Sequence, residues 1–231
     1  MTGTTGTPAV HTLQADSVVF RRGGRTILDR VTVTATAGRV LAVTGPSGAG
    51  KSTLLACLAG LTAPTEGQIT VDGRPLTVGD DHYLRRVGLI LQGYGLISVL
   101  TAAENVELVL QSRRVPAAET GRRAVEALEQ VGLAGQANHL AEALSGGQQQ
   151  RLAIARALVD QPQIVIADEP TAELDTDTRN TILQLLRDHA SRGAAVIIAT
   201  HDPEVTELAD DEIGLRDGRT AAMPSPMDIR R

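Results

Sequence analysis

The segment that decides the fold reads RVLAVTGPSGAGKS and runs from Arg39 to Ser52. It opens with a short apolar run, which is typical of a strand buried on both faces of a parallel sheet. The remainder matches the pattern GxxxxGK followed by Ser or Thr at every fixed position. Glycines let backbone N–H groups curl around phosphate oxygens, and the next helix directs its positive N-terminus at them. The segment therefore predicts a strand, a phosphate-binding loop and a helix.

This loop carries the first candidate site. Lys51 is expected to reach the β- and γ-phosphates of a nucleotide, Ser52 to ligate Mg²⁺, and Thr53 to lie near the α-phosphate. A glycine-rich turn that binds nothing is the alternative, and the complete pattern after a buried strand argues against it. The predicted nucleotide-binding residues are Gly45, Pro46, Ser47, Gly48, Ala49, Gly50, Lys51, Ser52 and Thr53.

A pair of carboxylates, Asp168 and Glu169, forms the second candidate site. They follow the apolar run Ile164–Ala167, which predicts another buried strand. Asp168 at the end of such a strand can hold Mg²⁺, and Glu169 is then placed to polarise the water that attacks the γ-phosphorus. Acidic residues at a strand end often only cap a helix or face solvent, and Pro170 favours a turn. Downstream of a phosphate-binding loop, we favour the metal and base roles.

Composition limits the class of protein. The chain has 231 residues, which fits one globular unit or one core with a small lobe attached. Apolar residues make up 42%, yet there are two Tyr, one Phe and no Trp, so the core must consist of Leu, Val, Ile and Ala. The net charge is -5 with both signs interspersed. No basic footprint for nucleic acid is visible, and nucleic acid is not an expected partner.

No membrane-spanning or secretory segment is expected. No apolar run approaches the roughly 20 residues needed to cross a bilayer, and the N-terminus has no apolar signal core. Cys57 is the only cysteine, so no intrachain disulfide is possible, which fits a reducing compartment. If the protein serves transport across a membrane, the pathway must lie on another polypeptide.

Hydrophobic patterns predict an α/β fold class. Residues 10–37 alternate β-branched and polar residues around Gly23-Gly24, and residues 67–78 turn at Asp72-Gly73, so both predict antiparallel strands. From about 101 to 158 the pattern is helical. The expected architecture is a P-loop core with a mostly parallel sheet, an N-terminal antiparallel β-subdomain and an inserted α-helical subdomain.

The same patterns give the expected boundaries. Beyond the strand at 39–44, strands are expected at Val87–Leu91, Ile164–Ala167 and Ala195–Thr200, and helices at Lys51–Leu61, Ala102–Gln111, Ala117–Val131, Gly146–Leu158 and Thr176–His189. The single domain spans 10–223, with the core and β-subdomain at 10–93 and 160–223, the helical subdomain at 94–159, and flexible tails at 1–9 and 224–231.

The stretch LSGGQQQR, from Leu144 to Arg151, resembles the signature motif of ABC-type ATPases. Ser145 is a good N-cap for the helix that follows, although Ser-Gly-Gly by itself is equally a flexible loop before a capped helix. The resemblance implies that the signature closes over ATP held by another copy of the domain. Two chains then pair head to tail with two ATP molecules between them. The residues assigned to that contact are Ser145, Gly146, Gly147 and Gln148.

The resemblance covers about Leu13 to Arg219 and implies further site residues. Gln92, after a buried strand, is similar to the family's Q-loop glutamine, a ligand of Mg²⁺, and His201 is similar to the switch histidine that contacts the γ-phosphate. Phe20 stands where the family places an aromatic that stacks on adenine, although it can equally be a core residue.

The loop after the carboxylate pair resembles the family's D-loop only in part. Asp175 matches the family residue that contacts the opposite subunit, and Ala172-Glu173 depart from the family pattern. The departure puts in doubt the fine coupling between the two sites. Glu169 is similar to the family's general base, so Glu169, His201, Gln92 and Lys51 form the catalytic set, with Ser52, Gln92 and Asp168 as metal ligands.

As a whole, the resemblance implies an ATPase subunit at the cytoplasmic face of a membrane, powering a separate multi-span permease. LSGGQQQR, ADEPT and THDPE resemble the lipoprotein-release, macrolide-export and cell-division group, whose permeases flex an extracytoplasmic domain, although Gln92–Ile97 lacks the paired Phe often seen there. A soluble ABC ATPase of translation or DNA repair is the alternative, and such proteins usually carry two cassettes or a long coiled-coil insertion. A P-loop kinase or GTPase would have no use for the signature.

The apolar segment Tyr94–Leu100 directly follows Gln92 and is the candidate docking site for the permease. Exposed Tyr, Leu, Ile and Val together would form a patch that a soluble monomer has little reason to display. The alternative is that these side chains pack between the two subdomains.

Overall fold

A six-stranded sheet lies at the centre of the computed structural model, which describes residues 10–221. The strand order is β10-β9-β3-β8-β7-β6, and every neighbouring pair is parallel except β10 with β9. Parallel strands place their carboxyl ends on one edge of the sheet, where the connecting loops meet. The strands are β3 (Val40–Thr44), β6 (Val87–Ile90), β7 (Ile164–Asp168), β8 (Ala195–Thr200), β9 (Asp211–Arg216) and β10 (Arg219–Ala221).

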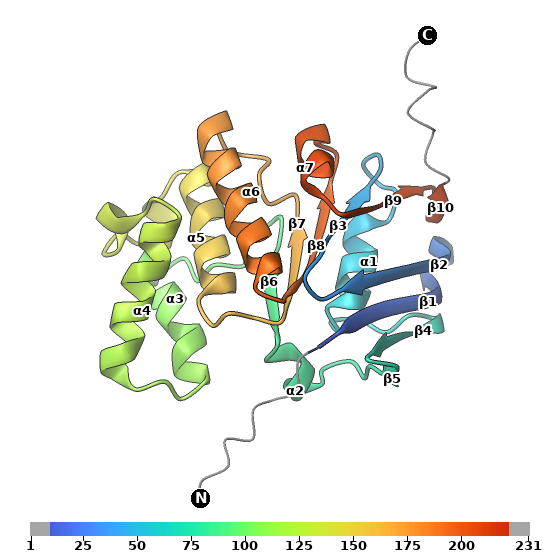
Figure 1. Cartoon of the computed structure of the whole chain (residues 1–231), viewed down its shortest axis with the longest axis horizontal. Helices are drawn as coiled ribbons and strands as arrows, with labels where there is room; N and C mark the ends of the chain where they lie inside the picture. The colour runs from blue at the N-terminus through green and yellow to red at the C-terminus, as the bar shows by residue number, and fades with distance from the viewer. Residues whose placement is uncertain (1–9, 222–231) are drawn as a thin grey trace, which may run out of the picture.

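Both faces of this sheet are buried, as its near-continuous apolar strands require. Along β7, Ile164 and Ile166 point to one hydrophobic cluster, whereas Val165 and Ala167 point to the other. Helix α1 (Lys51–Leu58) packs in the first cluster, and helices α5 (Gly146–Leu158) and α6 (Thr176–Ser191) pack in the second. The sheet is therefore the middle layer of the molecule (Figure 1).

A second sheet, formed mainly from the N-terminal region, is antiparallel throughout, with order β2-β1-β4-β5. Its strands are β1 (Thr12–Arg22), β2 (Arg25–Thr36), β4 (Glu66–Val71) and β5 (Arg74–Pro75). The predicted turns at Gly23-Gly24 and Asp72-Gly73 join these strands. One face of this sheet shares its hydrophobic cluster with α1 and β3. In Figure 1 it lies at the opposite end of the molecule from the helices α3 (Ala102–Ser112) and α4 (Ala117–Gln130).

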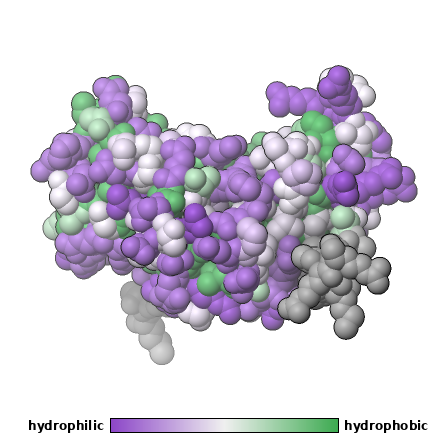
Figure 2. Space-filling view, turned by 90° about the horizontal axis from the view of Figure 1, so that it is seen from above, coloured by the Kyte–Doolittle hydropathy of each residue, from purple (hydrophilic) through white to green (hydrophobic). Residues whose placement is uncertain are grey.

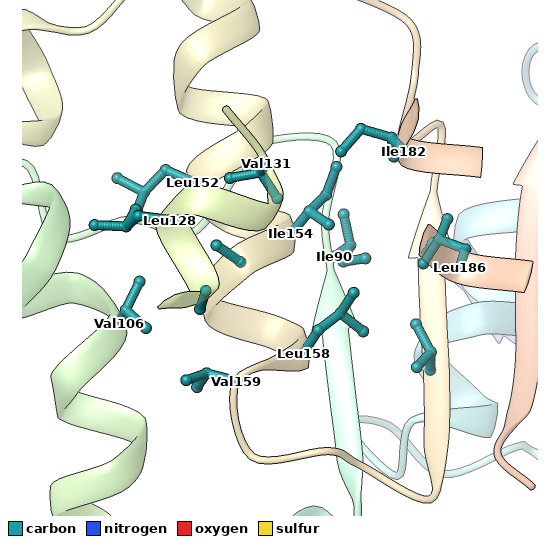
Figure 3. Close-up of a cluster of buried hydrophobic side chains, with 14 of the residues drawn as sticks. Ile90, Val106, Leu128, Val131, Leu152, Ile154, Leu158, Val159, Ile182 and Leu186 are labelled. Atoms are coloured by element: carbon teal, nitrogen blue, oxygen red, sulfur yellow. The ribbon is translucent and has the colours of Figure 1, made fainter. Parts of the chain in front are cut away.

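The helical subdomain contains α3 (Ala102–Ser112), α4 (Ala117–Gln130), two short 3-10 segments (Ala134–Gln136 and Ala141–Ala143) and α5. Thr101 and Glu104 form a capping box at the start of α3. Figure 3 shows Val106, Leu128 and Leu152 on the subdomain side, and Ile90 and Leu186 on the core side. Ile154 and Leu158 of α5 lie between them in one continuous cluster. The division at residues 94–159 stays a prediction, and one hydrophobic cluster contains residues of both parts.

Most expected elements agree with the structure to within a few residues, and the fold class is confirmed. Helix α1 ends at Leu58 rather than Leu61, because Gly60 turns the chain with a φ of 69°. The sequence reading did not place α2 (Asp81–Leu84), α7 (Pro203–Leu208), β9 or β10. β9 carries charged, exposed residues at both ends, so its apolar stretch, Ile213 to Leu215, is shorter than the runs that revealed the inner strands. The flexible tails expected at 1–9 and 224–231 lie outside the described residues.

No helix within residues 10–221 has the length and apolar character required to cross a membrane. The face seen in Figure 2 is largely hydrophilic, with hydrophobic residues in small separate groups.

Candidate functional site

The loops at the carboxyl ends of the central strands enclose a cleft of about 650 Å³. It collects residues from four separate parts of the predicted site: the phosphate-binding loop, the glutamine after β6, the carboxylate pair at the end of β7, and the histidine after β8. The lining residues are Ile27, Pro46, Ser47, Gly48, Ala49, Gly50, Lys51, Ser52, Thr53, Gln92, Asp168, Glu169, Ala172 and His201. This position agrees with the rule that open α/β sheets bind ligands outside the carboxyl ends of their strands.

The phosphate-binding loop is held closed by Lys51, the first residue of α1. Its ammonium nitrogen donates to the carbonyl oxygen of Gly45 at 2.8 Å and to that of Pro46 at 3.3 Å. Gly50 has a φ of 103°, and a Cβ there would come within 2.8 Å of the Leu28 side chain. Only glycine fits this position without strain. The loop therefore presents its backbone N–H groups and the N-terminus of α1 to the cleft, which suits an anion.

Glu169 and His201 meet inside the cleft although 32 residues separate them in the sequence. The His201 Nδ1 lies 2.8 Å from Oε1 of Glu169, and the Lys51 nitrogen lies 3.9 Å from the same oxygen. The Glu169 side chain is mostly buried at 13% exposure, whereas His201 is 72% exposed. One carboxylate thus lies between a cation of the phosphate-binding loop and an imidazole, close to where a γ-phosphate would be held.

The three expected metal ligands also line this cleft. They are the hydroxyl of Ser52, the amide of Gln92 and the carboxylate of Asp168, which is buried at 7% exposure. All three supply oxygen donors, the type that Mg²⁺ prefers, so the residues present fit that ion. Among the described residues there is no cluster of three or more His, Cys, Asp or Glu side chains that could hold a metal. A magnesium site here would therefore rely on hydroxyl and amide donors and on the nucleotide.

The loop after Glu169 leads into α6 through Asp175, which is a helix cap in this structure. The Asp175 carboxylate accepts hydrogen bonds from the Thr178 backbone N–H at 3.0 Å and the Thr178 hydroxyl at 2.8 Å. These two hydrogen bonds hold the pKa of Asp175 below its ordinary value. One turn further, the guanidinium of Arg179 contacts Glu204 at 2.9 Å and Asp202 at 3.4 Å. This ion pair ties the start of α6 to the residue after His201.

The signature residues do not line the cleft of their own chain. Ser145 caps α5. Its hydroxyl oxygen accepts a hydrogen bond from the Gln148 backbone N–H, and the Gln148 side-chain oxygen accepts one from the Ser145 N–H. This is a capping box, and the first turn of α5 after it, Gly146 to Gln149, is half-buried. None of Ser145 to Gln148 is among the lining residues of the cleft. A site that needs both the cleft and the signature must take the signature from another chain.

The structure differs from the prediction at Phe20 and in the segment after Gln92. Phe20 is partly buried against the cluster beneath the antiparallel sheet and does not line the cleft, where Ile27 of the neighbouring strand lies instead. The role of Phe20 in stacking on adenine stays a prediction. Its packing against the hydrophobic cluster supports the alternative that it is a core residue. Ile27 and Ala172 were not proposed as site residues. Neither residue belongs to a recognisable sequence motif, because one is an apolar strand residue and the other is an alanine in a loop.

The docking segment after Gln92 is also only partly as expected. Tyr94 and Leu96 are half-buried, and Leu96 packs against the hydrophobic cluster of the helical subdomain. Ile97 and Val99 are exposed at 44% and 69%. The expectation of one exposed patch including Tyr94 and Leu96 was therefore wrong for those two, because the segment folds back on α5 there. Leu91 and Leu140 are exposed as well, at 40% and 41%.

Comparison with known proteins adds three findings. Residues 28–172 match the family model described as "ABC transporter". An uncharacterized ABC transporter ATP-binding protein of Bacillus subtilis is 43% identical over 83% of this chain and 86% of its own length. A methionine import ATP-binding protein of Brucella abortus is 39% identical over 89% of this chain, but this chain spans only 57% of that relative.

One solved structure of an ATP-binding cassette is also similar to this chain. It is the dimeric, post-hydrolysis state of an ATP-binding cassette bound to ADP and phosphate. That chain is 37% identical, with a TM-score of 0.85, over 91% of this chain and 97% of the other.

Proposed function

The chain belongs to the ABC transporter family of ATP-binding proteins, and from this premise we propose that it hydrolyses ATP to drive a separate membrane permease. The observation that carries the proposal is the meeting of Glu169, His201 and Lys51 in the cleft that the phosphate-binding loop lines. The translation or DNA-repair alternative is not favoured, because the relatives named above are described as transporter or import proteins.

The residues of the cleft divide the chemistry between them. The loop amides and Lys51 bind the β- and γ-phosphates and offset the charge that develops on them during transfer. Glu169 is the proposed general base, which takes a proton from the attacking water. His201 fixes the Glu169 carboxylate through the 2.8 Å contact and lies beside the γ-phosphate position. Catalysis by this set is mainly positioning and charge stabilisation, because phosphoryl transfer asks little covalent chemistry of a protein.

Ser52, Gln92 and Asp168 are the proposed magnesium ligands. A Mg²⁺ ion bound there would neutralise charge on the phosphate oxygens. Gln92 also begins the segment toward the permease, so one residue connects the nucleotide to the docking region. Two chains pair head to tail, so that Ser145, Gly146, Gly147 and Gln148 of one complete the cleft of the other. Asp175 lies at that interface, and its contact with the opposite subunit is part of the proposal.

The permease is proposed to carry the membrane pathway and to hold this chain at the inner face of the membrane. Its docking site is the exposed set Leu91, Ile97, Val99 and Leu140. We further propose a permease with an extracytoplasmic domain, as in the lipoprotein-release, macrolide-export and cell-division group, from the likeness of the signature and of the residues around Glu169 and His201.

The first prediction tests Glu169 as the base. Glu169→Gln keeps the shape of the side chain and its hydrogen bonds but cannot take the proton. It should retain ATP binding, lose turnover by about two or more orders of magnitude, and accumulate as an ATP-bound dimer. ATPase assays with the permease present, nucleotide titration and light scattering measure the three effects.

Glu129→Gln, at an exposed position in α4, is the matched control for the loss of one negative charge. It should match the unaltered chain in all three measurements. Near-normal ATPase activity in Glu169→Gln would remove Glu169 from the proposed role.

A further inference from the structure

Three loops meet at the side chain of Glu173, the residue that departs from the family D-loop. The Tyr94 hydroxyl and the Glu173 carboxylate lie next to each other at the backbone of Gly146. The same carboxylate lies directly over Gly146, where a Cβ added to Gly146 would overlap it and would be 3.5 Å from the Tyr94 oxygen. The segment after Gln92, the signature and the loop after Glu169 are thus joined at one point.

The signature glycines make this approach possible. A Cβ at Gly147 would come within 2.9 Å of the Glu173 carbonyl oxygen, so the backbone of the loop also rests on the first turn of α5. In this chain the two glycines therefore leave room for Glu173.

Tyr94 is held in place from the other side by α5. Arg156 donates to the carbonyl oxygen of Tyr94 at 2.8 Å and to that of Gly95 at 2.5 Å. Tyr94 has a φ of 57°, in the left-handed region that costs a residue with a side chain about 1 kcal/mol or more. Burial, together with the nearby Glu173, raises the pKa of Tyr94 to about 12.

We propose that Tyr94 and Glu173 are positioning residues that form a latch over Gly146, and that this latch opposes ATP-driven closure of the dimer. The inference rests on the proposed function, in which the signature of one chain approaches the nucleotide of the other. A phosphate that approaches the backbone of Gly146 must displace the Glu173 carboxylate from that position. The two groups are also both negative, so closure has to break the Tyr94 contact and move the carboxylate away.

The latch also explains how the docking segment can influence the composite site. Tyr94 lies two residues after Gln92 and three before Ile97, between the cleft and the exposed docking residues. A permease that moves this segment would pull the Tyr94 hydroxyl from Glu173. The Glu173 carboxylate would then be free to move away from Gly146. The dimer would therefore close at a lower ATP concentration.

The test uses full-length chains carrying Glu169→Gln, in which hydrolysis does not obscure dimerisation. Light scattering measures the ATP concentration at half-maximal dimer. Adding Glu173→Gln removes the charge, and adding Tyr94→Phe removes only the hydroxyl. Each should lower the midpoint about two- to fivefold, the size of one charge interaction at a helix terminus. Together they should lower it by less than the product of the two effects, because both break one contact.

Glu129→Gln in the same background is the control for net charge and should leave the midpoint unchanged. A midpoint that stays the same or rises in either folded latch variant overturns the latch while leaving the proposed function intact. Failure of the Glu169→Gln parent to dimerise with ATP overturns the head-to-tail dimer and the latch with it. Tyr94→Phe keeps the ring and its packing, so it decides the matter even if Glu173→Gln does not fold.

Discussion

Some residues in this protein have unfavourable backbone conformations that the contacts around them stabilise. Glu169 has a φ of 50°, in the left-handed region, at the point where β7 ends. Its N–H donates to the Ala199 carbonyl of the neighbouring strand at 2.9 Å, and its carboxylate meets His201. Such backbone conformations cost about 1–3 kcal/mol and persist where the structure around them holds them. Here the strained turn directs the carboxylate into the cleft.

His189 provides a pH prediction at the same scale. It is buried at 6% exposure, and its Nε2 lies 2.8 Å from the Pro162 carbonyl oxygen. Burial lowers the pKa of His189, more than that hydrogen bond raises it. The unfolded chain therefore binds the proton more readily, with a pKa of about 6.5. Neutral His189 therefore makes its full contribution to the free energy of unfolding above about pH 6.5. This contribution is lost as the pH falls through the lower pKa of the folded state, by up to about 1.4 kcal/mol per pH unit.

Urea unfolding at pH 7.5 and at pH 5.5 measures this loss. His189→Gln places an amide near the Pro162 carbonyl and does not titrate, so the difference in unfolding free energy between the two pH values should shrink. His139→Gln, at an exposed position, is the matched control and should keep the full difference. An unchanged pH dependence in His189→Gln would show that another group is responsible.

Among the elements, the segment from Ile97 to Thr101 has its backbone fixed by one buried side chain. Asn105 of α3 is completely buried and accepts from the Ile97 N–H at 2.9 Å. Its amide donates to the carbonyl oxygens of Ile97 and Thr101 at 3.0 Å each, and to that of Leu100 at 3.3 Å. A buried amide with its hydrogen bonds satisfied rigidifies what it touches. Ile97 and Val99 are therefore presented to solvent by an ordered loop.

Replacing these two residues tests the docking segment. Ile97→Asp combined with Val99→Asp should weaken co-purification with the permease at least about tenfold, because apolar contact is lost and two charges would be buried. ATP binding should persist, since neither residue lines the cleft. Leu108→Asp combined with Val125→Asp is the control, because these two side chains on α3 and α4 are also exposed apolar residues, at 38% and 43%. Equal effects of the two pairs would place docking elsewhere.

At the scale of the whole molecule, one chain carries two separate halves of the composite site that we propose. The cleft lies where the loops at the carboxyl ends of the central strands meet, and the signature lies at the start of α5 outside the cleft lining. The continuous cluster through Ile90, Ile154 and Leu158 packs the helical subdomain onto the core (Figure 3). A second copy is the proposed source of the missing half.

Mixing two inactive variants tests this arrangement. In a head-to-tail dimer of Lys51→Ala and Ser145→Arg chains, both lesions fall on one composite site and the other site is intact. Each variant alone damages both sites. Equal mixing should restore about a quarter of the unaltered activity, since about half of the dimers are mixed and each has one working site.

The measurement is steady-state ATPase activity as a function of mixing ratio, in a system that tolerates one working site. Two preparations of the same variant, mixed in the same way, are the control and should recover nothing. Full activity of either variant alone would contradict the head-to-tail site.

The sequence by itself determined the elements whose signals are local. A buried strand shows as an apolar run, a helix as a period of 3.6 residues with a cap, and a phosphate-binding loop as glycines at fixed spacing. For this reason α5 and β8 occupy the residues expected of them, Gly146–Leu158 and Ala195–Thr200. β9 was missed because its short buried centre is flanked by charged, exposed residues and forms no such run.

Only the tertiary structure decided which of these elements are neighbours. The order β3-β8-β7-β6 is not the order of the chain, and it brings His201 onto Glu169 across 32 residues. It also places Ile27 rather than Phe20 in the cleft lining, and Glu173 over Gly146. Contacts of this kind depend on how strands and loops from distant parts of the sequence pack together. A pattern within one segment specifies that segment's own conformation, whereas the partner of each side chain is set by the packing of the whole chain.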